Sequence, residues 1–256
     1  MYFDTHAHYD DARFDMDRGA LLDMLPREGV DLVVVPGSDM ASSARAVALA
    51  GQYPYVYAAV GVHPQETGAM CEADLDVLRR MADEAKVVAI GEIGLDYYYD
   101  EPAREIQKTW FARQIALAKE LGLPIVVHNR DAHADCLAML RQEDVGRTGC
   151  VMHCFSGSVE YARQCLALGM YLSVGGVLTF KNAARLPQVI EEVPLERLFL
   201  ETDSPYLAPE PHRGKRNDSR YLKFVAQKIA EIKQIPIEQV AAVTKQNACR
   251  FFGISD

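Results

Sequence analysis

Short apolar runs alternate with longer amphipathic segments along the whole chain. Each run is rich in Val, Ile, Leu or aromatic residues and is bounded by Gly, Pro or polar residues, which is typical of buried strands. The runs lie at residues 2–8, 30–35, 56–62, 87–92, 125–128, 150–155, 171–175 and 198–202. The pattern therefore predicts eight strands.

The segments between these runs have helical spacing, in which apolar residues recur every three or four positions. One predicted apolar stripe consists of Ile106, Trp110, Leu117 and Leu121. A second, after the last apolar run, consists of Leu222, Val225, Ile229 and Ile232. Gly122 is a suitable C-cap for the first of these helices, and Pro124 prevents that helix from continuing.

Eight strands that alternate with helices predict an α/β protein with a (β/α)8 TIM barrel. A doubly wound open sheet is the structural alternative. Barrels of this kind typically need about 250 residues. The 256-residue chain contains no linker, low-complexity stretch or internal repeat. We therefore expect a single domain over residues 1–256.

Composition and charge narrow the functional class. Hydrophobic residues make up 49% of the chain and charged residues 25%, which excludes a disordered or collagen-like protein. The net charge of −9 argues against a protein that grips nucleic acid over a broad surface.

The sequence lacks the marks of a secreted or membrane protein. It begins without a basic region and an apolar signal core, and no window approaches the roughly 18 apolar residues of a membrane span. The six cysteines contain no CxxC pair. We therefore expect a cytoplasmic protein with no membrane contact, whose cysteines are buried reduced thiols.

Side chains that can bind metals cluster at the carboxyl ends of the predicted strands, where barrels of this class build their active sites. Five of the seven histidines fall there: His6, His8, His63, His128 and His153. The other two, His133 and His212, lie at a predicted helix start and in a loop.

The ligand set indicates two cations rather than one. Side chains alternate along a strand, so His6, His8 and Asp4 point to one side, where the carboxylate can orient an imidazole. With Glu92 and Asp203, the histidines supply more ligands than one tetrahedral zinc uses. Two divalent cations bridged by Glu92 fit better, and the N/O donors suit Mg, Mn, Zn or Fe.

Seven ordered motifs resemble the TatD family of metal-dependent hydrolases over nearly the whole chain. They are Asp4-Thr5-His6-Ala7-His8, Gly61-Val62-His63-Pro64, Gly91-Glu92-Ile93-Gly94-Leu95-Asp96-Tyr97, His128-Asn129-Arg130-Asp131-Ala132, His153-Cys154-Phe155-Ser156-Gly157, Glu201-Thr202-Asp203-Ser204-Pro205-Tyr206-Leu207-Ala208-Pro209 and Arg213-Gly214-Lys215-Arg216-Asn217. Relatives in the wider amidohydrolase-like group often carry a carboxylated lysine on the fourth strand. Glu92 stands at that place here, which is the TatD arrangement.

The resemblance implies a barrel that binds up to two divalent cations. The first cation would be held by His6, His8, Glu92 and Asp203. The second would be held by His128, His153 and the bridging Glu92. Many members of the family are deoxyribonucleases, and some act as exonucleases from the 3′ end. D-aminoacyl-tRNA deacylation, the alternative, is described for others.

Three further residues have two interpretations each. Asp203 is a general base that accepts a proton from water, or it only binds metal. His63, which the metal set does not need, contacts a phosphate oxygen or leaving group, or it is structural. Glu201 faces the lumen and positions substrate, or it forms a buried salt bridge with Arg130.

The segment 212–216, with Arg220, is the candidate phosphate-binding surface. Arg213 and Lys215 would clamp phosphates beside the metals. A solvated loop is the alternative. Tyr97, Tyr98 and Tyr99 follow the Glu92 strand and either stack on bases or pack the rim.

These observations favour a two-metal deoxyribonuclease that cleaves phosphodiester bonds with metal-activated water. The active-site ligands alone do not distinguish it from an ester or amide hydrolase, because both reactions use the same nucleophile. A catalytically silent metal- or partner-binding protein is disfavoured by the unbroken ligand set. The acidic net charge predicts a small footprint on a DNA end, and we expect a monomer or weak oligomer.

Overall fold

The computed structural model describes residues 1–99 and 101–255. The described residues form two compact units. The first comprises Met1–Val35, Cys154–Arg163 and Tyr171–Asp256, and the second comprises Pro36–His153 and Gln164–Met170. Each unit is described by itself below.

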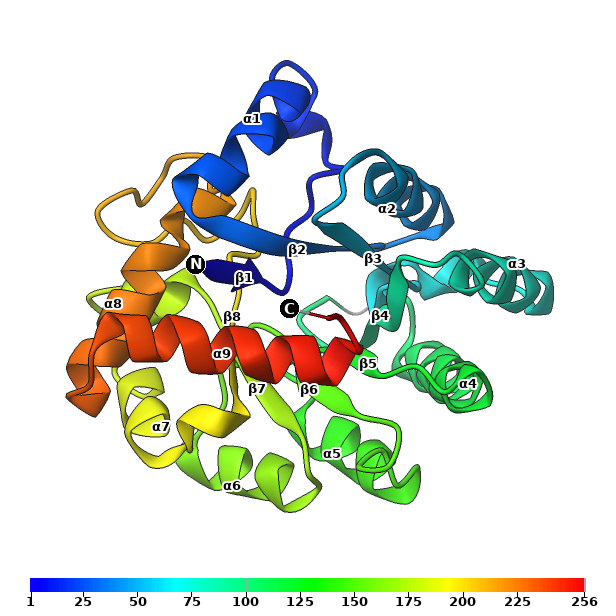
Figure 1. The fold of residues 1–256 in the computed structure, drawn as a ribbon. Helices are drawn as coiled ribbons and strands as arrows, with labels where there is room; N and C mark the ends of the chain where they lie inside the picture. The colour runs from blue at the N-terminus through cyan, green and yellow to red at the C-terminus, as the bar shows by residue number, and fades with distance from the viewer. Residues whose placement is uncertain (100, 256) are drawn as a thin grey trace. The chain divides into compact units, whose positions relative to one another are not determined.

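Strands and helices alternate along the chain (Figure 1). The strands are β1 (Tyr2–Asp4), β2 (Val30–Pro36), β3 (Val56–Val60), β4 (Val87–Asp96), β5 (Ile125–Arg130), β6 (Cys150–Met152), β7 (Tyr171–Val174) and β8 (Leu198–Leu200). The α-helices are α1 (Arg18–Met24), α2 (Met40–Gln52), α3 (Glu72–Ala82), α4 (Arg104–Leu121), α5 (His133–Gln142), α6 (Val159–Ala167), α7 (Leu186–Glu192), α8 (Leu222–Lys233) and α9 (Ile237–Phe252).

The strands pair in parallel and follow chain order in the sheet. In the first unit β1 pairs with β2 and β7 with β8, and in the second unit β3 to β6 pair successively. The sheet order runs from β1 to β8. The Thr5 N–H donates to the Leu200 carbonyl at 3.1 Å, joining the ends of the first and last strands as a barrel requires. The predicted (β/α)8 fold is confirmed.

The strand ends differ from the prediction where the site residues lie. β1 ends at Asp4 instead of residue 8, yet the Ala7 N–H still donates to the Val34 carbonyl at 3.1 Å. β4 continues to Asp96, four residues beyond the predicted end, because its register with β5 persists to the Asp96–Arg130 pair. Ladder hydrogen bonds, which depend on the neighbouring strand, decide these ends.

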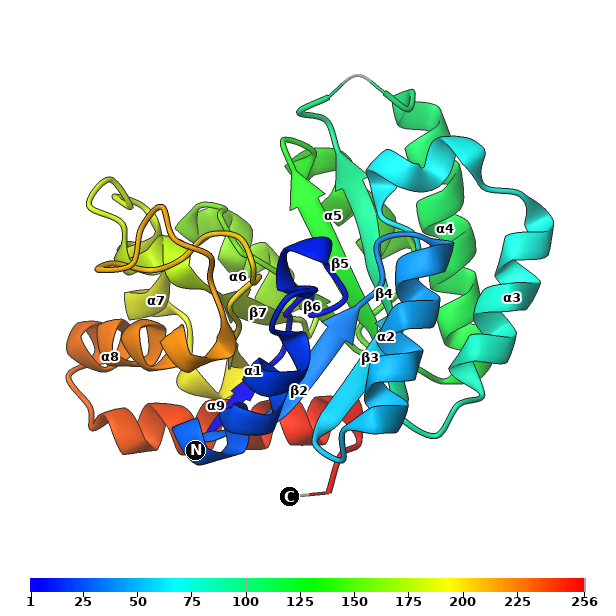
Figure 2. The same cartoon turned by 90° about the horizontal axis from the view of Figure 1, so that it is seen from above.

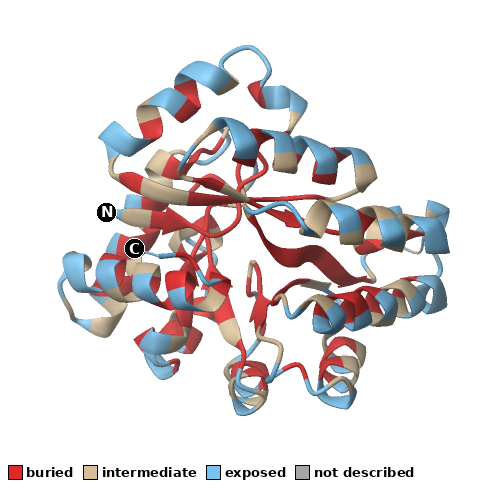
Figure 3. Ribbon diagram, turned by 45° about the vertical axis from the view of Figure 1, so that its right-hand side comes forward, coloured by how far each residue is buried: buried red, intermediate tan, exposed pale blue. Residues whose placement is uncertain are grey.

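Buried residues dominate the strands, whereas the helices carry exposed residues on their outer sides (Figure 3). In the first unit α8 and α9 lie side by side (Figure 2). Leu222, Val225 and Ile229 of α8 are buried as predicted, and Ile232 is half-buried.

The predicted stripe on α4 is confirmed only in part. Leu117 is buried, whereas Trp110 and Leu121 are half-buried and Ile106 is 41% exposed. The buried face also includes Phe111 and Ile115. It also contains two glutamines, Gln107 and Gln114, because their amides satisfy backbone groups at strand ends. A hydropathy pattern treats Gln as polar, so it does not place Gln107 and Gln114 on the buried face of the helix. The predicted C-cap Gly122 is confirmed in the left-handed conformation.

Four of the six cysteines are buried, and Cys154 is half-buried while Cys71 is exposed. All six are free thiols, as predicted, although the expectation of general burial is wrong for Cys71. Within the described ranges, no helix combines the length and apolarity needed to cross a membrane.

Candidate metal centre

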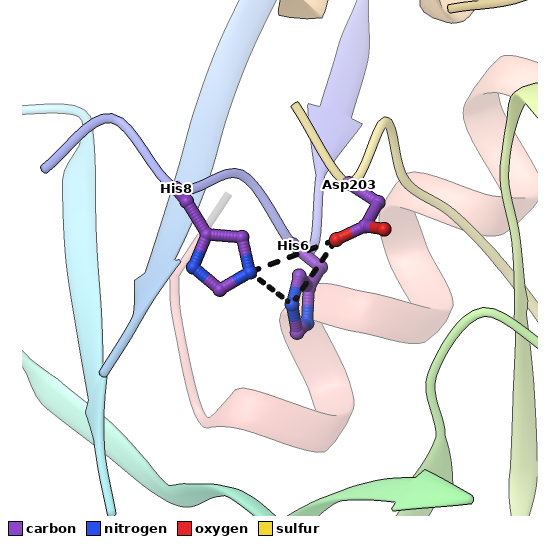
Figure 4. A group of neighbouring side chains, drawn as sticks. All are labelled: His6, His8 and Asp203. Atoms are coloured by element: carbon purple, nitrogen blue, oxygen red, sulfur yellow. Dashed lines mark hydrogen bonds and ion pairs between the residues drawn. The ribbon is translucent and has the colours of Figure 1, made fainter. Parts of the chain in front are cut away.

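Each unit contains one group of histidines and carboxylates that is a candidate metal site. The first group consists of His6 and His8, which follow β1, and Asp203, which follows β8 (Figure 4). The His6 and His8 Nε2 atoms lie 3.1 Å apart. Asp203 Oδ1 lies 3.8 Å from His6 Nε2 and 3.6 Å from His8 Nε2.

Backbone hydrogen bonds hold the segments of the first group together. The Asp203 N–H donates to the His6 carbonyl at 2.9 Å, and the His8 N–H donates to the Ser204 carbonyl at 2.7 Å. Asp203 has φ 56°, a left-handed conformation that non-glycine residues rarely adopt. This conformation turns the chain at the end of β8 and directs the Asp203 carboxylate toward the two imidazoles.

Asp4 does not orient an imidazole, which corrects the role expected from strand parity. Its carboxyl oxygens accept hydrogen bonds from the Thr202 and His6 N–H groups and from the Thr202 and Ser219 hydroxyls, at 2.6–3.3 Å. No imidazole in the described chain donates to it. Burial raises the pKa of Asp4 to about 7, although these hydrogen bonds oppose the shift. Asp4 thus ties the chain after β1 to the chain after β8.

The second group surrounds one carboxylate oxygen, Glu92 Oε1, at the middle of β4. His128 Nδ1 lies 2.8 Å from it, His153 Nε2 lies 3.0 Å from it and His63 Nε2 lies 3.7 Å from it. The Glu92 side chain is 5% exposed. Three imidazole nitrogens therefore converge on a buried anion.

His128 lies between two carboxylates. Its Nδ1 faces Glu92, and its Nε2 lies 3.1 Å from Asp96 Oδ2. Burial lowers the pKa of His128, but the hydrogen bonds to Asp96 and Glu92 outweigh it and leave the pKa raised. Burial raises the pKa of Asp96, but the hydrogen bonds from His128 and the Tyr98 N–H leave it lowered. A carboxylate that orients a histidine in this way fixes the nitrogen available to a metal.

Asp96 was not among the sequence-predicted site residues. The signal was present, because Asp96 follows Glu92 by four positions and thus has the same strand parity. It was missed because the predicted strand ended at Glu92.

His63 stays neutral over a wide pH range. Its Nδ1 accepts a hydrogen bond from the Gln65 N–H at 3.2 Å, which leaves the proton on Nε2, facing Glu92. Burial and the neighbouring His128 lower the pKa of His63 to about 3, even though Glu92 opposes the shift. His63 is therefore a hydrogen-bond donor rather than a proton donor at neutral pH.

Close backbone packing positions the second group. Gly94 has φ +150°, and a Cβ at this position would overlap the His128 carbonyl, so only glycine lets β4 approach β5 here. The Gln114 amide accepts from the Val62 N–H at 2.8 Å and donates to the Val62 carbonyl at 3.0 Å, which fixes the residue before His63. The Gln107 amide pairs in the same way with the backbone of Asp96.

The donor chemistry of both groups fits divalent cations. In the first group two imidazole nitrogens and one carboxylate oxygen lie within 4.8 Å of one another, as do the His63, Glu92 and His128 donors in the second. The Nε2 atoms of His6 and His8 face each other 3.1 Å apart. A cation or a proton shared between two such nitrogens stabilises this arrangement. His, Asp and Glu donors without thiolate suit Mg, Mn, Fe or Zn.

Glu201 is fully buried, and its Oε1 accepts the Cys154 N–H at 2.6 Å. Cys154 has φ 44°, so its backbone amide is presented from a left-handed turn. The Arg130 guanidinium lies over the Tyr98 ring, 3.7 Å from its centroid. Glu201 therefore acts first as an anchor for the chain after β6.

The basic segment divides into paired and unpaired cations. Arg216 donates to both Asp17 oxygens at 2.6–2.7 Å, and Arg220 pairs with Asp218 at 2.8 Å. In the described part of the chain no carboxylate pairs with the exposed Arg213 or Lys215. Of the basic residues in the candidate phosphate-binding surface, Arg216 and Arg220 are therefore neutralised, and the clamp by Arg213 and Lys215 stays a prediction.

The three tyrosines after β4 have different surroundings. Tyr97 donates its hydroxyl to Asp135 at 2.8 Å, which places it in a packed position at the rim. Tyr98 and Tyr99 are 56% and 53% exposed, with their rings edge to face 4.8 Å apart.

Comparisons with known proteins identify the family. The model of the TatD related DNase family matches residues 3–253. The chain is 46% identical to an uncharacterized metal-dependent hydrolase, YabD, of Bacillus subtilis, with 100% of each chain covered. It is 35% identical to the 3′-5′ ssDNA/RNA exonuclease TatD of Cronobacter turicensis, covering 98% of this chain and 97% of that one.

A solved structure gives the same result. The YjjV TatD homologue of Escherichia coli superposes with a TM-score of 0.93 at 34% identity, covering 99% of this chain and 98% of that chain. With the matching motifs and the His–carboxylate groups described above, these similarities show that the chain belongs to the TatD related DNase family of metal-dependent hydrolases.

Proposed function

We propose that this hydrolase cleaves phosphodiester bonds at the ends of DNA strands with one divalent cation in each histidine group. The observation that carries the proposal is the convergence of buried imidazoles on Asp203 and on Glu92. The relative that is named a 3′-5′ ssDNA/RNA exonuclease supports the choice of substrate and of the 3′ end.

Bound divalent cations would lower the pKa of water and stabilise negative charge on a phosphoryl oxygen. Asp203 accepts a proton from the attacking water, because its side chain, 15% exposed, is more accessible than those of Glu92 and Asp96, which are 5% and 2% exposed. His63 donates a hydrogen bond from Nε2 to a phosphate oxygen, since its lowered pKa keeps it neutral. Glu92, His128 and His153 would hold the second cation.

Arg213 and Lys215 contact the phosphates next to the cleaved bond. Both are exposed, and neither is neutralised by a carboxylate in the described part of the chain. Because the whole chain has a net charge of −9, this attraction is local, so the enzyme holds only a few nucleotides.

The test uses metal-free protein reloaded with Mg, Mn or Zn. Oligonucleotides labelled at the 5′ or 3′ end, single- or double-stranded, DNA or RNA, are digested and resolved by length. Stepwise shortening of the 5′-labelled single strand is the expected result. A parallel reaction with D-aminoacyl-tRNA measures the alternative activity.

The Asp203→Asn variant, loaded with the same metal, is the matched control for contaminating nucleases. Deacylation by wild type without any digestion of DNA would overturn the proposal. So would equal digestion by wild type and Asp203→Asn. Metal identity is then assigned by elemental analysis of the protein that supports the highest rate.

A further inference from the structure

A few exposed aromatic rings lie close in sequence to the candidate ligands. Among the described residues, the exposed large hydrophobic side chains include three aromatic rings: Tyr98, Tyr99 and Tyr206. Tyr206 follows Asp203 by three positions, and Tyr98 follows Asp96 by two. Scattered surface hydrophobes need no explanation, but rings gathered beside candidate ligands point to binding.

Tyr206 is held rigidly beside the first histidine group. Its N–H donates to the Asp203 carbonyl at 2.9 Å, and its carbonyl accepts the side-chain amide of the buried Asn217 at 2.8 Å. The ring stands edge to face against His8, with centroids 6.2 Å apart. The position of the ring is therefore set by the same segment that presents Asp203.

A fixed cation accompanies the ring. The Arg13 guanidinium lies 4.0 Å from the Tyr206 centroid, and it is held by two hydrogen bonds to Asp11, at 2.9 Å and 2.7 Å. Tyr206 nevertheless remains 46% exposed. We call Tyr206 with Arg13 the Tyr206 platform.

The chemistry of the platform suits one ligand class. A rigid, exposed ring loses little conformational freedom when a flat group stacks on it, and every nucleobase offers such a face. The Arg13 guanidinium lies over one face of the ring and is neutralised by Asp11, so its contribution is to hold the ring in place. In a duplex the base faces are covered by their neighbours, so a ring of this kind takes an unpaired base.

We propose that the Tyr206 platform is a subsite for an unpaired nucleobase adjacent to the bond that is hydrolysed. This assignment rests on the proposed nuclease function and deepens it, because it makes single-stranded ends the preferred substrate. The nucleobase stacks on the face of the Tyr206 ring opposite Arg13, and Arg13 keeps the ring in place.

The test compares two short 3′ single-stranded oligonucleotides, one intact and one with an abasic terminal nucleotide, on metal-loaded protein. For the intact strand, Tyr206→Ala is expected to raise KM by about 5- to 150-fold, the range that follows from loss of one base–aromatic stack. For the abasic strand, wild type and Tyr206→Ala are expected to differ by less than about twofold.

Three controls separate stacking from other roles of the ring. Tyr206→Phe keeps the ring and should retain the preference for the intact strand, whereas Tyr206→Leu keeps apolar bulk and should lose it. Met16→Ala removes another exposed apolar side chain of the same unit, 96% exposed, and serves as the matched surface control. Metal content is measured in all variants, because Tyr206 contacts His8.

A second readout does not depend on turnover. Quenching of a terminal 2-aminopurine on binding reports stacking directly, and it should disappear in Tyr206→Ala. Equal effects of Tyr206→Ala on both strands, unchanged quenching, or loss of metal in the variant would overturn the stacking assignment while the nuclease function stands. Quenching without cleavage by wild type would instead overturn the nuclease function.

Discussion

The two histidine groups are built differently. In the second group, three imidazoles surround Glu92, whose side chain is 5% exposed. The register of β4 with β5 shifts between Ile90 and Ile93, and directly after Glu92 it runs unbroken from the Ile93–Val127 pair to the Asp96–Arg130 pair. In the first group, two imidazoles face Asp203, whose side chain is 15% exposed, and all three residues lie beyond the strand ends.

The difference separates two tasks. A buried carboxylate among several imidazoles suits tight, permanent metal binding. A more exposed carboxylate on a turn can exchange a proton with water. We therefore expect Glu92 to serve mainly in metal binding and Asp203 mainly in proton transfer.

The largest effect, on metal content and on kcat/KM, is expected from substitutions that remove the charge of Glu92 or of Asp203. Glu92→Gln is expected to lower bound metal, measured by elemental analysis, and to reduce kcat/KM by more than about 100-fold, since even residues behind the ligands contribute 10- to 100-fold. Asp203→Asn should retain most of its metal and lose the acidic limb of the pH–rate profile. Equal metal loss in both variants would remove the distinction and leave Asp203 a simple ligand.

The second effect is a loss of stability when the close packing of β4 against β5 is disturbed. Gly94→Ala is expected to lower the free energy of unfolding by about 2–4 kcal/mol, because the new Cβ meets the His128 carbonyl and the backbone is strained at φ +150°. Gly122→Ala is the matched control: it also has positive φ, +68°, but has open space around it, so about 1 kcal/mol is expected. Urea unfolding measures both, and similar losses would argue against a special packing role for Gly94.

The third effect is the opposite pH response of two histidines in metal-free protein. The folded pKa of His128 is raised, so its contribution to stability is complete below its unfolded pKa, about 6.5, and is lost as pH rises through the folded pKa. The folded pKa of His63 is lowered to about 3, so its contribution is complete above about 6.5 and is lost as pH falls toward 3.

Unfolding of metal-free protein between pH 4 and pH 9 measures these contributions. His128→Asn should flatten the alkaline decline, and His63→Asn should flatten the acidic one. If His63→Asn changed only the alkaline side, the neutral assignment of His63 would be wrong.

The smallest effect should come from the basic segment. Arg213→Ala and Lys215→Ala should each raise KM a few-fold and reduce the salt dependence of binding by about one unit of slope. Arg216→Ala should leave that slope unchanged and cost about 0.5–1 kcal/mol of stability, because it loses its bond to Asp17. Binding titrations at several salt concentrations check this, and a slope change in Arg216→Ala would contradict the division of the segment.

Much of the fold and of the candidate site could be predicted because the signals are local. Apolar runs at regular intervals predicted the eight strands in their order. Every member of the first group lies at the carboxyl end of such a run or directly after it. Asp96 escaped prediction because the end of β4 depends on pairing with β5. The burial of Gln107 and Gln114 on α4 could not be predicted, because it depends on hydrogen bonds between their amides and the backbone at strand ends.

The sequence by itself determined the barrel class, the family and the candidate ligand types, since hydrophobic periodicity and motif spacing are properties of neighbouring residues. Only the tertiary structure decided which cations of the basic segment are neutralised. It also decided that Asp4 hydrogen-bonds to the chain after β8 instead of to a histidine ring. It placed Tyr206 in contact with Arg13 and His8. Arg216 and Asp17 are 199 positions apart in the sequence, and Asp4 and Ser219 are 215 positions apart. Contacts at that separation depend on the folding of the whole chain, and no local pattern encodes them.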